Sequence, residues 1–98
     1  MKQYAVVAYD HTDEDALGRR LANREAHLEG VRRLAEQGRF LSGGAILGED
    51  GRMIGSNAHF AFPDRQALDA WLETEPYMTG NVWEHVDIRE VKLFEPNT

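Results

Sequence analysis

Arg24 and His27 lie in the apolar stripe of a predicted amphipathic helix, where polar side chains are unexpected. Positions 20, 24, 27, 31 and 34 fall along one side of such a helix, and Val31 and Leu34 mark that side as buried. A buried guanidinium or imidazole is costly unless another group pairs with it. The spacing therefore indicates a satisfied structural pair, or a site where an imidazole transfers protons and a guanidinium holds an anionic or phenolic oxygen.

Two acidic residues are candidates for orienting the imidazole. Asp10 ends the first predicted strand, and Glu75 follows the second predicted helix, so both should lie towards the same end of the sheet. An imidazole held by a carboxylate is a common general acid/base unit. The sequence leaves open whether Glu75 or Asp10 is the partner of His27. A purely structural role for the histidine also stays open.

Small and hydroxyl-bearing residues indicate a ligand cavity beside the histidine. Gly43 and Gly44 in the second predicted strand remove side-chain volume where the helix packs, which predicts a cavity next to His27. Ser42 and Ser56 flank this cavity and can bond a ligand oxygen, although strand hydroxyls often bond backbone groups instead. The predicted ligand-binding residues are Arg24, Ser42, Gly44, Ser56 and Tyr77.

Large apolar side chains near the second helix also favour a flat ligand, and the irregular segment 75–81 is the predicted lid. Core packing is the alternative reading, which we favour for Trp71 and leave open for Tyr77. The side chains concerned are Trp71, Tyr77, Met78 and Trp83.

The elements that position these residues follow the order βαββαβ. A capping box at Thr12 and Asp15 predicts the start of the first helix, and Gly38 predicts its end. Pro63-Asp64 predicts the start of the second helix. The predicted strands are Gln3–Asp10, Arg39–Leu47, Met53–Phe62 and Val86–Phe94, and the helices run to about residue 37 and over about 65–74.

This order predicts an α+β, ferredoxin-like fold: a four-stranded antiparallel sheet with two helices on one face. We expect a single domain over residues 1–98. Residues 4–9 (YAVVAY) are apolar on both alternating faces, so the second sheet face should also be covered. The predicted partner is a second copy of the chain, which would make a homodimer through the open sheet face.

Composition and missing motifs narrow the function classes. The formal net charge of −6 opposes nucleic acid, and the paired arginines 19–20 and 32–33 are most simply solvated. No cysteine is present, and the histidines lack metal-ligand spacing, so neither a metal nor a cofactor is predicted. No signal peptide or membrane span is predicted either, which makes a cytoplasmic protein the default.

The joint pattern of several short motifs resembles the YCII-related family, named for the small bacterial protein YciI. The motifs are RxxHL at 24–28, RFLSGGAI at 39–46, Gly55-Ser56, Trp71 and EPYMTGNV at 75–82. The resemblance implies a subunit of the dimeric α/β-barrel type with an active-site pair of histidine and aspartate. His27 matches the histidine, and Glu75 occupies the position of the aspartate, one methylene longer. Asp10 is the second choice.

The preferred functional hypothesis is a small cofactor-free lyase or isomerase in which His27 moves a proton on a small cyclic or enolisable substrate. The resemblance implies lyase chemistry on small ring compounds without a metal or organic cofactor. The main alternative is a non-catalytic dimeric module that binds a small molecule or assists a partner enzyme. A cofactor-free monooxygenase is a third hypothesis, because dimeric α/β barrels include such enzymes.

Overall fold

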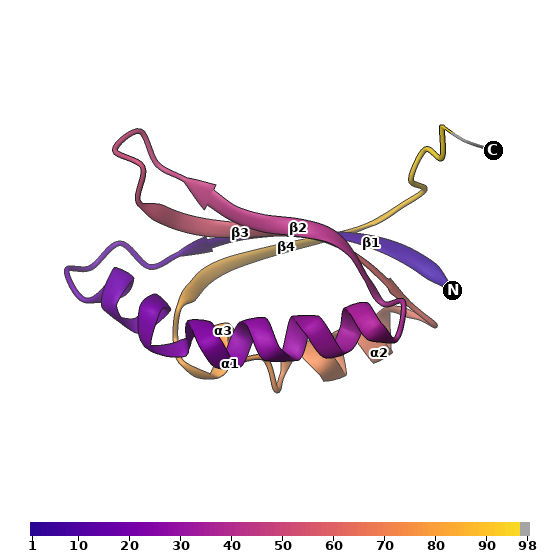
Figure 1. The fold of residues 1–98 in the computed structure, drawn as a ribbon, viewed down its shortest axis with the longest axis horizontal. Helices are drawn as coiled ribbons and strands as arrows, with labels where there is room; N and C mark the ends of the chain where they lie inside the picture. Colours follow the sequence, from indigo (N-terminus) through magenta and orange to yellow (C-terminus); the bar gives the residue numbers. More distant parts are fainter. Residues whose placement is uncertain (97–98) are drawn as a thin grey trace.

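Four strands form one antiparallel sheet in the computed structural model, which describes residues 1–96. The sheet order is β2-β3-β1-β4, and both long helices cover the same face (Figure 1). The predicted ferredoxin-like α+β fold is therefore confirmed. The single domain over 1–98 stays a prediction, and residues 97 and 98 lie outside the described part. The elements are β1 (Lys2–Asp10), α1 (Ala16–Glu36), β2 (Phe40–Leu47), β3 (Met53–Phe62), α2 (Arg65–Leu72), α3 (Pro76–Thr79) and β4 (Trp83–Val91).

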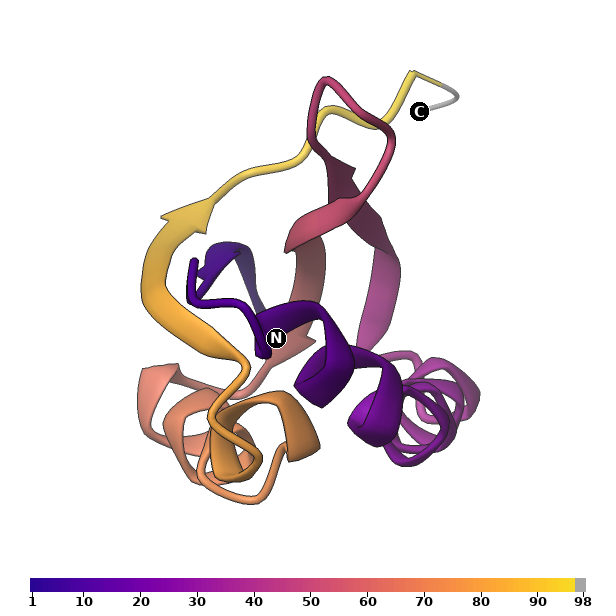
Figure 2. The same ribbon diagram turned by 90° about the vertical axis from the view of Figure 1, so that its left-hand side faces the viewer.

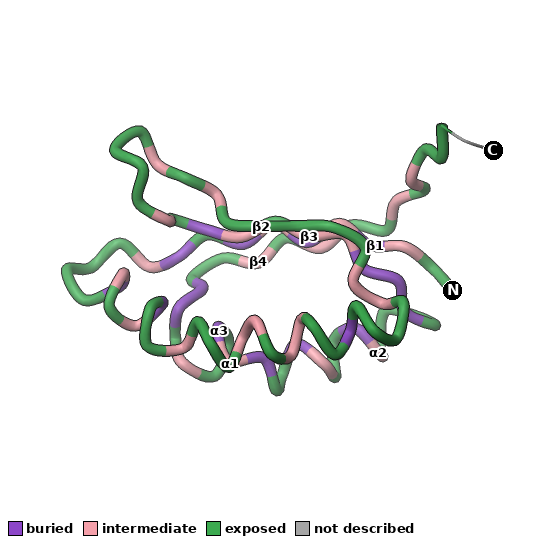
Figure 3. Tube along the Cα trace, in the orientation of Figure 1, coloured by how far each residue is buried: buried purple, intermediate pink, exposed green. Residues whose placement is uncertain are grey.

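The hydrophobic core lies between the sheet and the helices. Alternate residues of the central strand β1, namely Tyr4, Val6 and Ala8, face the helices and are almost fully buried. They pack with apolar side chains such as Leu34 of α1 and Leu68 of α2. Figure 3 shows buried positions gathered along this inner face, while much of the edge strand β2 is exposed. The polar stripe of α1 therefore faces the inner side of the sheet.

The other sheet face has no helix over it among residues 1–96 (Figure 2). Ala5 and Val7 of β1 are half-buried on this face, and Tyr9 is 48% exposed. His59 stands opposite Ala5 in the register, and its Nδ1 lies 3.1 Å from the Ser42 hydroxyl. This face is therefore part apolar and part polar, and it is open in the single chain.

Three local predictions differ from the structure. Asp15, rather than Thr12, is the N-cap of α1, because Asp13 accepts the Asp15 N–H and tightens the turn before the helix. The last strand spans Trp83–Val91, so it begins and ends three residues earlier than the expected Val86–Phe94. It begins earlier because Trp83 pairs with Asp10 across a bulge. The segment 75–81, predicted as irregular, contains the one-turn helix α3.

A polar clamp joins the start of α1 to the segment that precedes β4. The Arg19 guanidinium donates two hydrogen bonds of 2.8 Å to the Asp13 carboxylate. Its Nε donates at 3.1 Å to the carbonyl oxygen of Asn81, a residue with a left-handed backbone (φ 57°). The clamp holds α3 close to α1.

The described helices include none long and apolar enough to cross a membrane.

Because of this clamp, the free energy of unfolding should decrease at acid pH. Hydrogen bonds from Arg19 hold the pKa of the Asp13 carboxyl well below its ordinary value of 3.8. Because the folded-state pKa is lowered, ionised Asp13 stabilises the fold above that value, and the stabilisation is lost as pH falls through the range beneath it. We predict that Asp13→Asn lowers the free energy of unfolding at neutral pH, and that its difference from wild type shrinks below about pH 4.

Urea denaturation from neutral pH down to acid pH measures this difference. Glu14→Gln is the matched control, because Glu14 is an exposed neighbouring acid outside the clamp. A gap between wild type and Asp13→Asn that stays constant at every pH would contradict the assigned ion pair.

Candidate functional site

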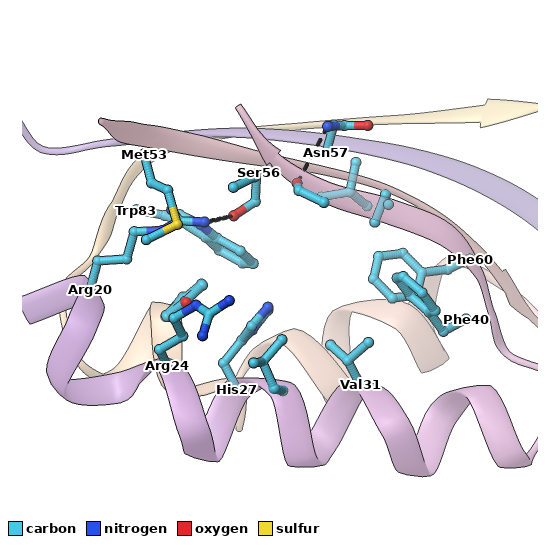
Figure 4. A pocket seen from close by; sticks show the side chains of 17 residues that line it. Arg20, Arg24, His27, Val31, Phe40, Met53, Ser56, Asn57, Phe60 and Trp83 are labelled. Atoms are coloured by element: carbon cyan, nitrogen blue, oxygen red, sulfur yellow. Dashed lines mark hydrogen bonds between the residues drawn. The ribbon is translucent and has the colours of Figure 1, made fainter. Parts of the chain in front are cut away.

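A cavity of about 170 Å³ lies between α1 and the inner face of the sheet. Figure 4 shows most of its labelled side chains pointing into this space from the helix below and the strands above, while the side chain of Asn57 lies above the strands. An apolar cavity of roughly 150 Å³ is large enough to hold benzene. The space beside His27 therefore accommodates one ring with a few attached atoms, which agrees with the cavity predicted from the glycine pair.

Helix α1 directs His27 into the cavity, where two aromatic side chains fix the ring. The imidazole stacks on the Tyr77 ring with centroids 3.9 Å apart and planes 12° from parallel. Trp83 meets the imidazole edge-on at 6.3 Å. The His27 side chain is only 15% exposed. Its ring is thus held between fixed neighbours but still borders the open space.

The Nδ1 atom of His27 forms a hydrogen bond with the Glu75 carboxylate. The Glu75 side chain is 1% exposed, and its second oxygen accepts the Tyr77 N–H at 2.7 Å. Glu75 is the N-cap of α3, with Pro76 at the first helical position, so the helix start holds the carboxylate in place. Because a carboxylate only accepts, this bond assigns the proton of the neutral imidazole to Nδ1, and in that tautomer Nε2 keeps a free lone pair.

A second buried pair, Arg20 with Asp10, closes one end of the cavity. Arg20 Nη1 donates to both Asp10 oxygens at 2.9 and 3.0 Å, and the two side chains are 3% and 4% exposed. Arg20 Nη2 donates to the Ser56 hydroxyl at 2.9 Å. The guanidinium carbon lies 4.7 Å from the centre of the Tyr77 ring. Arg20 is therefore a fixed cation that ties the strand end to the cavity wall.

Ser56 is held so that it acts as a hydrogen-bond donor. Its oxygen accepts from Arg20 Nη2 and also from Trp83 Nε1 at 3.2 Å. A serine oxygen has two acceptor positions, and both are used, so the remaining capacity is the O–H proton. Ser56 therefore favours a ligand oxygen that accepts a hydrogen bond, and it is poorly suited to be a nucleophile.

Burial shifts the pKa values of two groups around the cavity. Burial raises the pKa of the Asp10 carboxyl, and the hydrogen bond and charge of Arg20 oppose this shift only in part. Burial also raises the pKa of the Tyr77 phenol, against the charges of Arg20 and Arg24. Tyr77 therefore stays a neutral phenol at physiological pH, and it acts as a ring surface for His27 and not as a phenolate base.

Arg24 is the cation that remains available to a ligand. It lines the cavity one turn before His27, and Figure 4 shows its guanidinium turned into the space between helix and sheet. Its side chain forms no hydrogen bond or ion pair with any other residue of the range 1–96. An exposed guanidinium with five free donors is suited to an anionic oxygen.

The structure brings most of the sequence-predicted residues together. Arg24, His27, Gly44, Ser56 and Tyr77 all line the cavity, and Glu75 lies behind the imidazole. Two predicted residues and one candidate for the cavity wall are placed differently, namely Asp10, Ser42 and Met78. Trp71 has the core position that we favoured for it.

Each difference has a physical reason. Asp10 bonds Arg20, so of the two candidate acids only Glu75 contacts His27. Ser42 lies on the opposite sheet face with His59, because a bulge after Phe40 shifts the strand register. The bulge therefore separates Ser42 from the cavity.

Among the predicted wall residues, Trp71 packs in the core, 5.1 Å from Phe60. Met78 is 41% exposed and lies outside the cavity lining. The predicted lid also differs, because Glu75 and Tyr77 are buried within the segment 75–81.

Arg20 is the site residue that the sequence interpretation missed. The sequence predicts that Arg20 is solvated together with Arg19, and this prediction is wrong because Arg20 is buried. The available signal was its spacing, because position 20 lies one turn before Arg24 on the stripe that contains His27. Recognising it required knowing that Asp10 ends its strand opposite the same helical turn.

Comparison with known protein families gives one match. The model of the YCII-related domain matches residues 3–92, which is nearly the whole chain. A comparison with curated proteins finds no match. The described residues also include no group of three or more histidine, aspartate or glutamate side chains arranged to hold a metal ion.

Solved structures with the same fold include an enzyme and two further proteins. The 5-chloro-2-hydroxyhydroquinone dehydrochlorinase of Burkholderia phenoliruptrix AC1100, in complex with 2,5-dihydroxybenzoquinone, has a TM-score of 0.81 at 20% identity, covering 92% of this chain and 93% of that one. Rv0793 from Mycobacterium tuberculosis has a TM-score of 0.60 at 18% identity, covering 98% and 99%. A dimeric ferredoxin-like protein of unknown function from Jannaschia sp. CCS1 has a TM-score of 0.51 at 17% identity, covering 95% and 100%.

At these identities the structural neighbours bear on the fold alone. The family model, in contrast, spans both the strand-helix unit with His27 and the segment with Glu75. On this match, together with the fold, the chain belongs to the YCII-related family.

Proposed function

We propose that this protein is a small cofactor-independent enzyme that uses His27 and Glu75 for general acid/base chemistry on a small cyclic or enolisable substrate. The observation that carries the proposal is the buried Glu75 carboxylate on Nδ1 of a histidine whose Nε2 has no bonding partner among residues 1–96 and whose ring borders a ring-sized cavity. The reaction class is a lyase or an isomerase.

In the proposed mechanism, His27 Nε2 takes a proton from an acidic O–H or C–H of the bound substrate. The electron pair left behind becomes an enolate or phenolate, which Arg24 and the Ser56 hydroxyl stabilise. Glu75 stabilises the imidazolium that forms. In an isomerisation the proton returns to another substrate atom. In an elimination the leaving group departs with its bonding pair, and His27 releases the proton to water, so no oxidant is needed.

Similarity to the dehydrochlorinase supports the lyase class. As its name states, that enzyme removes hydrogen chloride from a hydroxylated ring, and its complex contains a one-ring dihydroxyquinone. A cavity of about 170 Å³ suits a ligand of this size. We propose the same type of chemistry for this chain, with the particular substrate left to experiment.

We predict that wild-type protein accelerates exchange of the C2 hydrogen of 1,3-cyclohexanedione in D₂O, measured by NMR against a buffer blank. The dione is an enolate near neutral pH, so exchange adds a deuteron at C2 and then removes the C2 proton. His27 is the group proposed to deliver the deuteron, which Nε2 takes up from solvent, and to accept the proton, so His27→Gln should lower the catalysed rate by about 10²- to 10⁴-fold. Glu75→Gln should cause a loss of similar size, because its amide favours the tautomer in which Nε2 already carries a proton.

Glu73→Gln is the matched control, since Glu73 is an exposed acid two residues away. Exchange by a folded His27→Gln variant at the wild-type rate would contradict the proposal. That outcome would favour the alternative, a non-catalytic module that binds a small molecule.

We also propose that the protein is a homodimer in which a second copy covers the open sheet face. Half-buried Ala5 and Val7, with exposed Tyr9, provide apolar area there, and a small domain gains from burying it. The similar protein from Jannaschia is described as a dimeric ferredoxin-like protein. The cytoplasmic location inferred from the sequence remains part of this proposal.

The dimer predicts a sedimentation mass of about twice the chain mass of 11.1 kDa at micromolar concentration. Val7→Lys introduces a charge at the centre of the open face and should shift the equilibrium towards monomer. A wild-type protein that sediments as a monomer throughout, with the same mass as Val7→Lys, would rule the interface out.

A further inference from the structure

The cavity has a polar end and an apolar end, with His27 between them (Figure 4). Arg20, Arg24 and Ser56 lie on one side of the imidazole. Val31, Phe40 and Phe60 lie on the other side, and the two phenylalanine rings meet edge to face at 5.8 Å. Asn57 borders the cavity, but its side chain lies above the strands in Figure 4, away from this space, and its amide donates to the Gly44 carbonyl oxygen at 3.3 Å. The far end therefore offers a ligand no free polar side chain.

Between the two ends the cavity passes over small residues. A Cβ on Gly43 would lie 2.5 Å from the Asn57 carbonyl oxygen and 2.9 Å from the Ala58 Cβ, so only glycine fits that position. With Gly43 and Ala58 on the strand side, a flat ring has room to lie across from the helix. A ring in this central part would reach both ends of the cavity. Its polar substituents would then lie at the end with Arg24 and Ser56, and its apolar substituents at the other end.

The fixed charges around the cavity favour a ligand with one negative charge. The Arg20 cation is matched by Asp10, with hydrogen bonds at 2.9 and 3.0 Å. The Glu75 anion bonds the imidazole of His27, and its charge is matched once that ring has taken the substrate proton. Arg24 is left as a cation without a protein anion among residues 1–96. A single anionic oxygen beside Arg24 and the Ser56 donor would complete this arrangement.

We propose that the substrate is a monocyclic anion, an enolate or phenolate, that carries a short uncharged alkyl substituent on the side of the ring away from the acidic oxygen. The anionic oxygen lies between Arg24 and Ser56, and the alkyl group lies among Val31, Phe40 and Phe60. This inference rests on the proposed function for its use of His27. It goes further because it sets the orientation of the ring and the polarity of both ends.

A series of 5-substituted 1,3-cyclohexanediones tests the proposal by calorimetric binding. These compounds are enolates near neutral pH, and the 5-substituent lies opposite the carbon between the two oxygens. The parent, 5-methyl and 5-isopropyl compounds should bind with rising affinity. The gain should be about fourfold for each buried methyl group, which corresponds to ~0.8 kcal/mol per group. Equal or falling affinity along the series would overturn the proposal.

Substitutions at the two ends should change binding in different ways. Val31→Phe fills the apolar end, so the alkyl gain should fall below about twofold while the parent compound still binds. Val31→Ala enlarges that end, so the gain in affinity should extend to the 5-phenyl compound. This second variant keeps the test valid if Val31→Phe does not fold. A full alkyl gain in Val31→Phe, or an unchanged profile in Val31→Ala, would overturn the placement of the alkyl group.

At the polar end, Arg24→Gln should weaken every compound by about the same factor, roughly tenfold, without changing the alkyl gain. Arg32→Gln is the matched control, because Arg32 is an exposed cation of α1 outside the cavity lining. A selective loss of the alkyl gain in Arg24→Gln would reverse the assigned orientation and overturn the proposal.

Binding and turnover can fail separately in this design. An alkyl gain without His27-dependent exchange supports the cavity assignment and removes the catalytic proposal. Exchange that depends on His27, without an alkyl gain, keeps the catalytic proposal and removes the substrate class inferred here.

Discussion

The site depends on the burial of one carboxylate. Glu75 is almost fully enclosed, and a buried carboxylate is tolerated only when its oxygens are hydrogen-bonded inside the protein. One oxygen accepts from the start of α3, and the other can reach only the imidazole that α1 supplies. The same bond that satisfies the carboxylate therefore orients His27, selects its tautomer and directs its second nitrogen to the cavity. The hydrogen bond between His27 and Glu75 therefore serves both the stability of the fold and the proposed proton transfer.

A second buried pair keeps the space beside this imidazole open. Arg20 is held through Nη1 by Asp10 and through Nη2 holds Ser56, so these contacts fix the polar wall, although the buried Nε of Arg20 has no hydrogen-bond partner among the described residues. On the opposite wall, Gly43 is kept small by its contact with the neighbouring strand. Among residues 1–96, the groups at the cavity with unused bonding capacity include Arg24, the Ser56 proton and His27 Nε2. These three are complementary to a ligand with an acidic oxygen, and the two buried pairs hold the walls that carry them.

Much of this arrangement can be predicted from local sequence patterns. Alternation and glycine signals predict the strand order, and the helical stripe predicts that Arg24 and His27 face inward, because both patterns depend on neighbouring residues alone. The choice of Glu75 over Asp10, the inward turn of Arg20 and the outward turn of Ser42 could not be predicted. They depend on which residues meet across the fold and on a bulge in β2 that shifts every later side chain by one position. The short helix α3 was also missed, since its stability comes from the Glu75 cap and the contact with α1.

The most direct test of the account is the proton position on the His27 ring, measured by ¹⁵N NMR of the imidazole in the wild-type protein and in Glu75→Gln. The bond to Glu75 predicts that the neutral ring carries its proton on Nδ1, that this proton is strongly deshielded, and that its signal is lost with a change of tautomer in the variant. A His27 ring that carries its proton on Nε2 in the wild type, or one that is unaffected by Glu75→Gln, would contradict it.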